Sequence, residues 1–398
     1  LCDRRQRQMC IRDRSTVCIM KPCGEILESP FDIGHTADEL DSLISLIKSF
    51  DEETRVVMED TGHYHLPVAT YLSSHNIFVC CVNALRMKKF CSQSIRRAKT
   101  DKIDSIKIAS FGITYWNELV KAYPSNVIYD ELKFLARQYY QVTGMLVKSK
   151  VNFSNLLDQV MPKINDVLSN QGENHKLTEF VSRYIHFQNI LDMGEMKFTS
   201  DYCKWAKKKG YRLNERKAAE ILALAQNGIP TLPNSQSVKI AVSEAVKLIH
   251  SIEESRNTIL AQMQDLCNTL PEYSVVKEMD CIGDTLAPRI IAEIGDVRRF
   301  KNKHSLIAYA GIDAPPYQSG AFHASERHIS KRGNSYLRKT GYEIMQSLIK
   351  HKPADNAVYD FIQKKRSEGK CGKEAMIAGL NKFLRVYYGK VMEFYSEH

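Results

Sequence analysis

The first part of the chain alternates short apolar runs with amphipathic ones. Apolar runs bounded by turn residues predict strands, and an apolar position every three or four residues predicts a helix. The expected elements are a pair of short strands around a Pro-Cys-Gly turn, a helix, a strand, a helix and a strand, at 16–29, 36–50, 54–59, 66–75 and 76–83. Thr36 is the expected N-cap of the first helix. A hairpin followed by β-α-β units indicates a mixed sheet flanked by helices, so we expect an α/β domain over residues 15–120.

The pattern then changes to heptads. Apolar residues recur at alternating spacings of four and three in two segments, which predicts two seams of a coiled coil. Their positions are Ile128, Leu132, Leu135, Tyr139, Val142, Leu146, Phe153, Leu156 and Val160 in the first, and Val238, Val242, Ala245, Ile249, Ile252, Ile259, Met263, Leu266 and Leu270 in the second. The seams can pair antiparallel within the chain or across a dimer, and either pairing is more typical of a scaffold than of an active site. We expect a helical coiled-coil region over residues 121–270.

A third pattern begins after Pro271. The segment VVKEMDCIGDTLAPRIIAEIGDVRRF predicts a helix, a turn containing Gly283 and a second helix. Such a helix-hairpin-helix can contact a phosphate through turn amides at a helix N-terminus, but a Gly turn between helices is often a plain connection. We expect a helical C-terminal domain over residues 271–398. The predicted fold class is α/β plus all-α.

Charge and composition narrow the possible partners. Lys and Arg outnumber Asp and Glu by 56 to 46, a net charge of +10, which favours a polyanion such as DNA. No run reaches the roughly 18 apolar residues of a membrane span, so we expect no membrane partner. The 11 cysteines include no Cys-x-x-Cys pair and are interpreted as reduced thiols in a cytosol.

The opening segment differs from the rest of the chain. LCDRRQRQMCIRDRS holds five arginines in fifteen residues and has neither helical nor strand periodicity. We interpret residues 1–14 as non-native, adaptor-like sequence; a genuine basic arm for nucleic acid is the alternative. In either case the first strand of the α/β domain is expected to be missing or truncated.

Three carboxylates are candidates for metal binding. Glu59 ends a predicted buried strand, where open α/β sheets present functional groups, and Asp101 and Asp104 share one face of a predicted helix. If they converge, their mutual repulsion is relieved by a hard cation such as Mg²⁺. Two such ions could act on a phosphodiester. The alternative is a solvated helix face, since Lys99, Lys102 and Lys107 lie beside the Asp pair.

Four segments together carry a family resemblance. They are VVMEDTGHYHLPVATYL, RRAKTDKIDSIKIA, IGDTLAPRIIAEIGDVRRF and YAGIDAPPYQSGAFHASERHISKRGNSYLR. In order and type they resemble bacterial insertion-sequence transposases with a RuvC-like (RNase H-like) DEDD domain and a C-terminal serine domain, related to pilin-gene inverting recombinases. The resemblance covers nearly everything from residue 15 on.

The resemblance implies roles for particular residues. The E and the two later Ds of DEDD match Glu59, Asp101 and Asp104, and the serine of a Ser-Gly motif matches Ser319. The first Asp of the family motif, on an opening strand of the type Gly-Ile-Asp-Val, has no match; Asp13 lies near that place but outside any strand pattern and is not carried over. The implied reaction is DNA cutting and rejoining through a covalent phosphoserine, assisted by Mg²⁺ and guided by a noncoding RNA.

Residues around Ser319 suit that reaction. A serine hydroxyl is a weak nucleophile, so it needs activation and fixed cations around the phosphate. Cations and glycines for DNA contact are expected at Arg327, Lys331, Arg332, Arg338, Lys339, Gly320 and Gly333. His323 and His328 are interpreted as loop histidines. Without the resemblance, the sequence favours Ser319 as a turn residue in a Pro/Gly loop, and the resemblance reverses that preference.

Assembly and rival functions complete the expectations. Exchange of strands between duplexes needs several active sites, so we expect a homodimer that forms a tetramer on DNA in the bacterial, nucleoid-associated cytoplasm. One rival is a metal-dependent RuvC-like junction nuclease, which needs the carboxylates but no covalent intermediate. The other is a catalytically decayed copy that only binds DNA.

Overall fold

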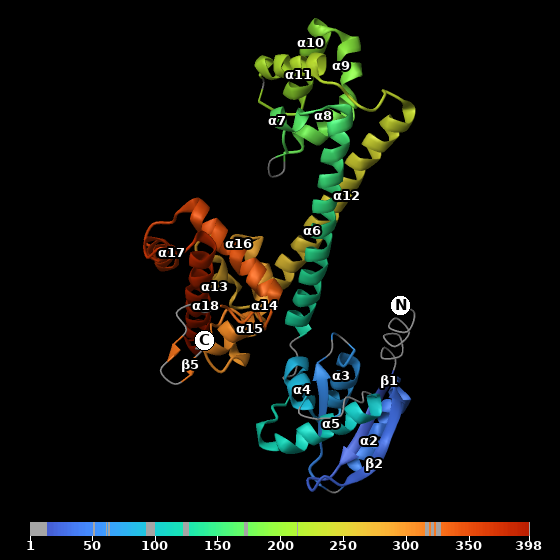
Figure 1. Cartoon of the computed structure of the whole chain (residues 1–398), viewed down its shortest axis with the longest axis vertical. Helices are drawn as coiled ribbons and strands as arrows, with labels where there is room; N and C mark the ends of the chain where they lie inside the picture. The colour runs from blue at the N-terminus through green and yellow to red at the C-terminus, as the bar shows by residue number, and fades with distance from the viewer. Residues whose placement is uncertain are drawn as a thin grey trace. The chain divides into compact units, whose positions relative to one another are not determined.

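The computed structural model describes residues 14–50, 52–60, 62, 64–92, 100–121, 127–170, 174–212, 214–314, 318–319, 322–323 and 328–397 (Figure 1). The chain divides into two compact units, Leu1–Ser125 and Asn126–His398. We call them the N-terminal unit and the C-terminal unit and describe each by itself. No helix among the described residues is both long enough and apolar enough to span a bilayer.

The N-terminal unit begins with the expected hairpin. Strands β1 (Arg14–Met20) and β2 (Ile26–Gly34) pair antiparallel, and the Lys21 amide donates to the Glu25 carbonyl at 2.8 Å across the turn. Gly24 has a φ of +90°. Glycine adopts this conformation more easily than other residues, which explains its place in the Pro-Cys-Gly turn. Helix α2 (Ala37–Lys48) follows, with Thr36 as N-cap as predicted, although the Thr36 side chain makes no capping hydrogen bond.

A β-α-β unit comes next. Strand β3 (Arg55–Asp60), helix α3 (Leu66–Ser74) and strand β4 (Phe78–Asn83) follow in that order, and β3 pairs parallel with β4. The unit closes with α4 (Ala84–Cys91), α5 (Asp101–Thr114) and the 3-10 turn η1 (Trp116–Glu118). Parallel pairing follows from the crossover helix, which returns the chain to the same edge of the sheet.

The expected single mixed sheet is not formed in the described part of the chain. The unit holds two separate two-stranded sheets, β1–β2 and β3–β4. Helix α5 packs against both β1 and β3 and so spans the two sheets. The two sheets stay separate in the described residues, because no described strand joins β1 to β3.

The C-terminal unit is built on two long helices, α6 (Val127–Val160) and α12 (Gln236–Asn268). They pack against each other along their length. Leu132 near the start of α6 shares a hydrophobic core with Met263 near the end of α12, whereas Leu157 and Val238 belong to a second core. The helices are thus antiparallel within one chain, which decides between the two pairings that the seams allow. Because the seams pair within the chain, they no longer support the expectation of a dimer.

The second core lies where α6 ends and α12 begins. Short helices enclose it: α7 (Ile164–Val167), α8 (Lys176–Tyr184), α9 (Phe187–Met193), α10 (Glu195–Lys208) and α11 (Glu215–Asn227). Phe180, Phe198 and Tyr202 are fully buried there and stack edge to face or tilted. Burial of several aromatic rings in one place accounts for the stability of this end of the hairpin.

The first core joins the other end of the hairpin to the C-terminal helices. Around it lie α13 (Tyr273–Lys277), α14 (Leu286–Ile294), η2 (Val297–Arg299), α15 (Lys303–Ala310), α16 (Ser335–His351), α17 (Ala357–Ser367) and α18 (Gly372–Glu397). The predicted helix, Gly turn and helix are present as α13, the turn around Gly283, and α14. Between α15 and α16 two short strands, β5 (Gln318–Ser319) and β6 (Phe322–His323), pair antiparallel.

Candidate active site

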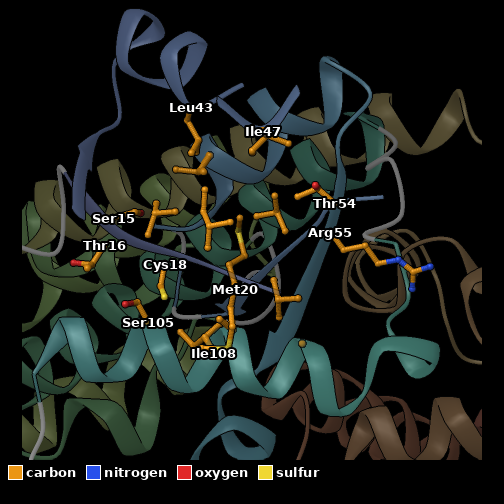
Figure 2. Close-up of a pocket in the computed structure, with 18 of the residues that line it drawn as sticks. Ser15, Thr16, Cys18, Met20, Leu43, Ile47, Thr54, Arg55, Ser105 and Ile108 are labelled. Carbon is orange, nitrogen blue, oxygen red and sulfur yellow. The ribbon is translucent and has the colours of Figure 1, made fainter. Parts of the chain in front are cut away.

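The three candidate carboxylates line one cavity in the N-terminal unit. Glu59 is the fifth residue of β3 and is paired in register with Val82 of β4, while Asp101 and Asp104 lie in the first turn of α5. All three border a cavity of about 1450 Å³. Figure 2 shows its walls: Ser15, Thr16, Cys18 and Met20 come from β1, Leu43 and Ile47 from α2, Thr54 and Arg55 from the β3 segment, and Ser105 and Ile108 from α5.

The cavity borders the edges of β1 and β3, not their faces. Every residue from Arg14 to Pro22 and from Glu52 to Glu59 lines it. Successive side chains of a strand point to opposite faces, so a space touched by all of them must lie beside the strand. No described strand pairs with the other edge of β1 or of β3. The cavity is therefore a slot between two open strand edges.

Helices close the slot on both sides. Leu43 of α2 and Val68 and Leu72 of α3 line one side, and Ile108 of α5 lines the other. Protein interiors are close-packed and hold few voids larger than a water molecule, and ligand pockets usually measure roughly 300–1,000 Å³. The slot exceeds this range, and core residues such as Leu43 and Val68 line it.

The donor atoms suit a divalent cation in kind, but they do not form a closed site. Carboxylate oxygens are the ligands that Mg²⁺ prefers. Among the described residues, however, no three or more His, Cys, Asp or Glu side chains are grouped so that they could hold a metal ion. The three carboxylates line the same cavity, but they are not grouped closely enough to coordinate one ion. Asp13 lies outside the described residues, so the metal site stays a prediction.

One residue of this cavity was missed by the sequence reasoning. His65, just before α3, lines the slot, and its Nε2 lies 3.7 Å from Asp60 Oδ1. Its buried Nδ1 has no hydrogen-bond partner in the described structure. The only sequence signal is its position six residues after Glu59, which is weak for a single histidine.

Ser319 lies in the C-terminal unit, in β5, opposite Phe322 of β6. Gly320 and Arg327 lie outside the described residues, and of His323 only the backbone is described. The described residues on either side of this segment, 311–314 and 328–334, form what we call the neck. The Ser330 amide donates to the Asp313 carbonyl at 2.8 Å, and the Lys331 amide donates to the Gly311 carbonyl at 2.9 Å. The two ends of the serine segment are thereby held together.

Tight backbone approach explains the glycines of the neck. A Cβ on Gly333 would lie 2.3 Å from the Tyr309 carbonyl oxygen, which is closer than any side chain allows. Gly311 has a φ of +66°, and a Cβ there would lie 3.1 Å from the Arg332 backbone. Gly333 was predicted to let the backbone approach DNA; here its missing side chain lets two backbone segments of the neck approach each other.

The predicted cations differ in their surroundings. Lys331 and Arg332 are exposed on the neck, and His328 is exposed as well. Arg338 is engaged inside the protein, where its Nη1 donates to the Ala310 carbonyl at 2.9 Å and to the Gly333 carbonyl at 3.2 Å. The Lys339 ammonium lies 5.1 Å from the centre of the Tyr140 ring. Lys331 and Arg332 are thus the cations best placed to meet a phosphate.

Two parts of the chain match models of known protein families. Residues 12–162 match the IS110-type DEDD transposase domain, described as "Transposase", and residues 273–360 match the domain described as "Transposase IS116/IS110/IS902 family". The chain belongs to the IS110 family of transposases. The carboxylates lie in the first matched region and Ser319 in the second.

Individual relatives agree with this assignment. The transposase is 22% identical over 299 residues to an uncharacterized protein of insertion element IS110 from Streptomyces coelicolor, covering 75% of this chain and 72% of that protein. It is 26% identical over 136 residues to the pilin gene-inverting protein of Moraxella bovis, covering 33% of this chain and 42% of that protein. A protein of insertion element IS116 from Streptomyces clavuligerus is 22% identical over 174 residues, covering 44% of the transposase and 43% of that protein.

Proposed function

We propose that the chain is a DNA transposase or site-specific recombinase that cuts and rejoins DNA through a covalent bond between Ser319 and a DNA phosphate. The observation that carries the proposal is the position of the two family matches, one over Glu59, Asp101 and Asp104 and the other over Ser319. The net charge of +10 suits a polyanionic substrate.

In the proposed reaction the Ser319 hydroxyl attacks the phosphorus of a phosphodiester. A bond forms between phosphorus and Ser319 Oγ, and the bond to the oxygen of one strand end breaks. The serine proton passes to water, and the departing oxygen takes up a proton. Attack by the hydroxyl of another strand end reverses these steps and frees Ser319. One phosphodiester replaces another, so no ATP is needed, and Lys331 and Arg332 would stabilise the charge on the phosphate.

Glu59, Asp101 and Asp104 are the residues that would hold Mg²⁺. When bound, the ion would supply positive charge to a phosphodiester. The carboxylates come from a strand and a helix that both border the slot, which supports a shared role. We propose a RuvC-like site in which these residues act together with one further carboxylate.

We propose that a strand fills the slot and brings that further carboxylate. The open edges of β1 and β3 each offer unpaired backbone groups, and a segment lying between them would complete both ladders at the usual spacing of about 4.8 Å. β1 has seven residues and β3 has six, so about six extended residues suffice. A segment that preceded Arg14 and turned back along β1 would reach this position, and it would join the two small sheets into the mixed sheet that the sequence pattern predicts.

RNA guidance and higher assembly are proposed on the resemblance. Base pairing by a noncoding RNA would read the DNA sequence while the protein contacts backbone and shape. A dimer that becomes a tetramer on DNA would supply several serines and carboxylate sites to the strands being exchanged. Light scattering with and without nucleic acid tests the assembly, which fails if only monomer is seen.

The decisive experiment is the covalent adduct. The chain, with residues 1–13 replaced by a strand and turn that fill the slot, is incubated with Mg²⁺, a labelled DNA fragment from the flank of its gene, and RNA transcribed from that flank. On a denaturing gel, label should migrate with the protein and be released by protease. Ser319→Ala should abolish adduct and cleavage while leaving DNA binding within twofold, and Ser335→Ala, at an exposed serine of α16, should change neither.

The junction nuclease remains the second candidate because the carboxylates share a cavity of their own in the N-terminal unit. It requires Asp101 and Asp104 but not Ser319. Cleavage that persists in Ser319→Ala without label on the protein would therefore replace the recombinase with the nuclease. Binding without cleavage in every variant, including the strand-filled chain, would identify a decayed DNA-binding copy.

A further inference from the structure

A buried carboxylate lies at the base of the neck. Glu293, in the last turn of α14, is 1% exposed. Its Oε1 accepts from Nη1 of Arg137, and its Oε2 accepts from Nη2 of Arg137 at 3.0 Å and from Nδ2 of Asn334 at 2.7 Å. Arg137 comes from the long helix α6, and Asn334 is the last residue of the neck. A single carboxylate therefore joins α6 to the segment that carries Ser319.

Asn334 uses both ends of its side-chain amide. Its Oδ1 accepts from the Tyr336 and Leu337 amides at 3.0 and 3.1 Å and caps the N-terminus of α16. Its backbone amide donates to the Tyr309 carbonyl at 2.8 Å. The NH₂ group is left to donate, and Glu293 is its nearest acceptor. Glu293 thus fixes which way the amide points, and with it both the start of α16 and the return of the neck.

Arg137 of α6 makes a second contact near Asn334, with the first turn of α16. Its guanidinium carbon lies 3.7 Å from the centre of the Tyr336 ring, in the first turn of α16. The bidentate pair with Glu293 and this stacking leave the guanidinium little freedom. Any rotation or sliding of α6 would move Arg137 and pull on Glu293. In the chain, α6 begins just after the boundary between the two units at Ser125.

A purely structural ion pair is the simpler explanation, and its properties argue against it. A buried ion pair contributes little net stability because both charges lose their hydration, and apolar residues of similar size often serve as well. The same helix offers a comparison: Arg289 of α14 pairs with Glu343 of α16 at 2.6 Å and is also buried, but no hydrogen bond of that pair involves the neck. Of these two pairs, the Glu293 pair is the one that is hydrogen-bonded to a residue of the neck, Asn334.

We propose that Glu293 is a positioning residue that couples α6 to the neck and so sets where Ser319 is presented. The proposal rests on the proposed function of Ser319. Movement of α6 when nucleic acid is engaged would reach the serine through Arg137, Glu293 and Asn334 in turn.

The test compares two matched variants, Glu293→Gln and Glu343→Gln. Each removes the carboxylate charge from an ion pair in which one partner belongs to α14, and each keeps the side-chain size. Hydrogen exchange is followed at the amides of Ser330, Lys331 and Asn334, whose acceptors lie across the neck or on α15. Glu293→Gln should speed exchange there at least tenfold and lower the rate of adduct formation at least tenfold, with DNA binding within twofold. Glu343→Gln should leave neck exchange and adduct rate within twofold of wild type.

A second variant covers the case in which Glu293→Gln does not fold, as judged by exchange in α18. Arg137→Lys keeps the charge but loses the bidentate geometry and the stacking on Tyr336, and it should give a smaller change of the same sign. Wild-type neck exchange in folded Glu293→Gln and in Arg137→Lys, or an equal effect of Glu343→Gln, overturns the proposal. The exchange experiment needs no cleavage, so a wild-type protein without adduct would refute the role of Ser319 while the coupling is still measured.

Discussion

The two units of this transposase differ in how their cores are packed. In the C-terminal unit the long hairpin and its surrounding helices bury side chains such as Leu157, Met263 and Ile290 completely. In the N-terminal unit a cavity of about 1450 Å³ lies beside the open edges of β1 and β3. The contrast follows from connectivity. An antiparallel pair of helices finds its partner within one chain segment, whereas a sheet strand can pair through both of its edges, and among the described residues β1 and β3 each pair through one edge only.

Filling the slot should produce the largest effect and remove much of the contrast. Replacing residues 1–13 with about six apolar, β-branched residues and an Asn-Gly turn should raise the unfolding midpoint of the N-terminal unit by about 10 °C or more, because buried apolar area contributes about 25 cal/mol per Å². Calorimetry and hydrogen exchange at β1 and β3 measure it. The same segment with two prolines should have no effect; an equal rise with the prolines would show that no strand is formed.

Truncation of matched leucines should expose the contrast directly. Leu157→Ala in the C-terminal unit should cost about 2–5 kcal/mol, because it opens a new cavity in a filled core. Leu43→Ala should cost about half as much, because Leu43 already borders empty space. Urea unfolding of each unit, followed by exchange, gives both values. Equal costs would mean that the slot is filled in solution by another part of the protein.

Thiol chemistry should separate the same regions with a smaller signal. Cys18 of β1 lines the slot, whereas Cys267 of α12 is fully buried. Burial raises the pKa of both thiols, to about 12 for Cys267, so neither is a reactive thiolate at pH 7 and access decides the rate. Alkylation mapped by mass spectrometry should be at least tenfold faster at Cys18. The strand-filled chain should lose this difference; if it does not, the reagent reaches Cys18 from outside the slot.

An ion pair of the C-terminal unit should give the smallest effect. The hydrogen bond from Arg183 lowers the pKa of Asp201, with burial opposing and the Tyr184 hydroxyl assisting. This contribution is present above the unfolded pKa of about 3.9 and is lost as pH falls through the lower folded value. Asp201→Asn should therefore cost no more than about 1 kcal/mol at pH 7, and the cost should vanish as pH falls through the lowered pKa of Asp201. A difference that persists once Asp201 is protonated in the folded protein would show that the charge is not its source.

Local pattern predicted the elements well and their long-range arrangement only in part. The hairpin, the β-α-β unit and both long helices follow from periodicity and turn residues, which act over a few positions. The separation of the two sheets could not be foreseen, because strand pairing depends on which segments fill the space between β1 and β3. Likewise, spacing placed Asp101 and Asp104 on one helix but could not show that Glu59 borders the same slot.

Surface charges were the least predictable part of the site. Arg338 and Lys331 look alike in the sequence as members of one basic run, yet Arg338 donates to two carbonyls of the neck and Lys331 is exposed. The difference depends on the left-handed backbone at Gly311 and the close approach at Gly333, which bring carbonyls within reach of one guanidinium. The hydrogen bonds of Glu293 could not be predicted from local sequence either, because its partners Arg137 and Asn334 are 156 and 41 residues away in the chain.

The long antiparallel hairpin also sets the distance between the two cores of the C-terminal unit. α6 has 34 residues and α12 has 33, and each helix belongs to one core at one end and to the other core at its opposite end. Inserting one heptad into both helices would separate the two cores by about 10 Å while preserving every seam contact, at 1.5 Å per residue. An insertion in one helix alone would throw the seam out of register. Relatives that differ in this span are thus expected to differ by paired, whole heptads, and a span that grows in this way moves the two cores apart without altering either.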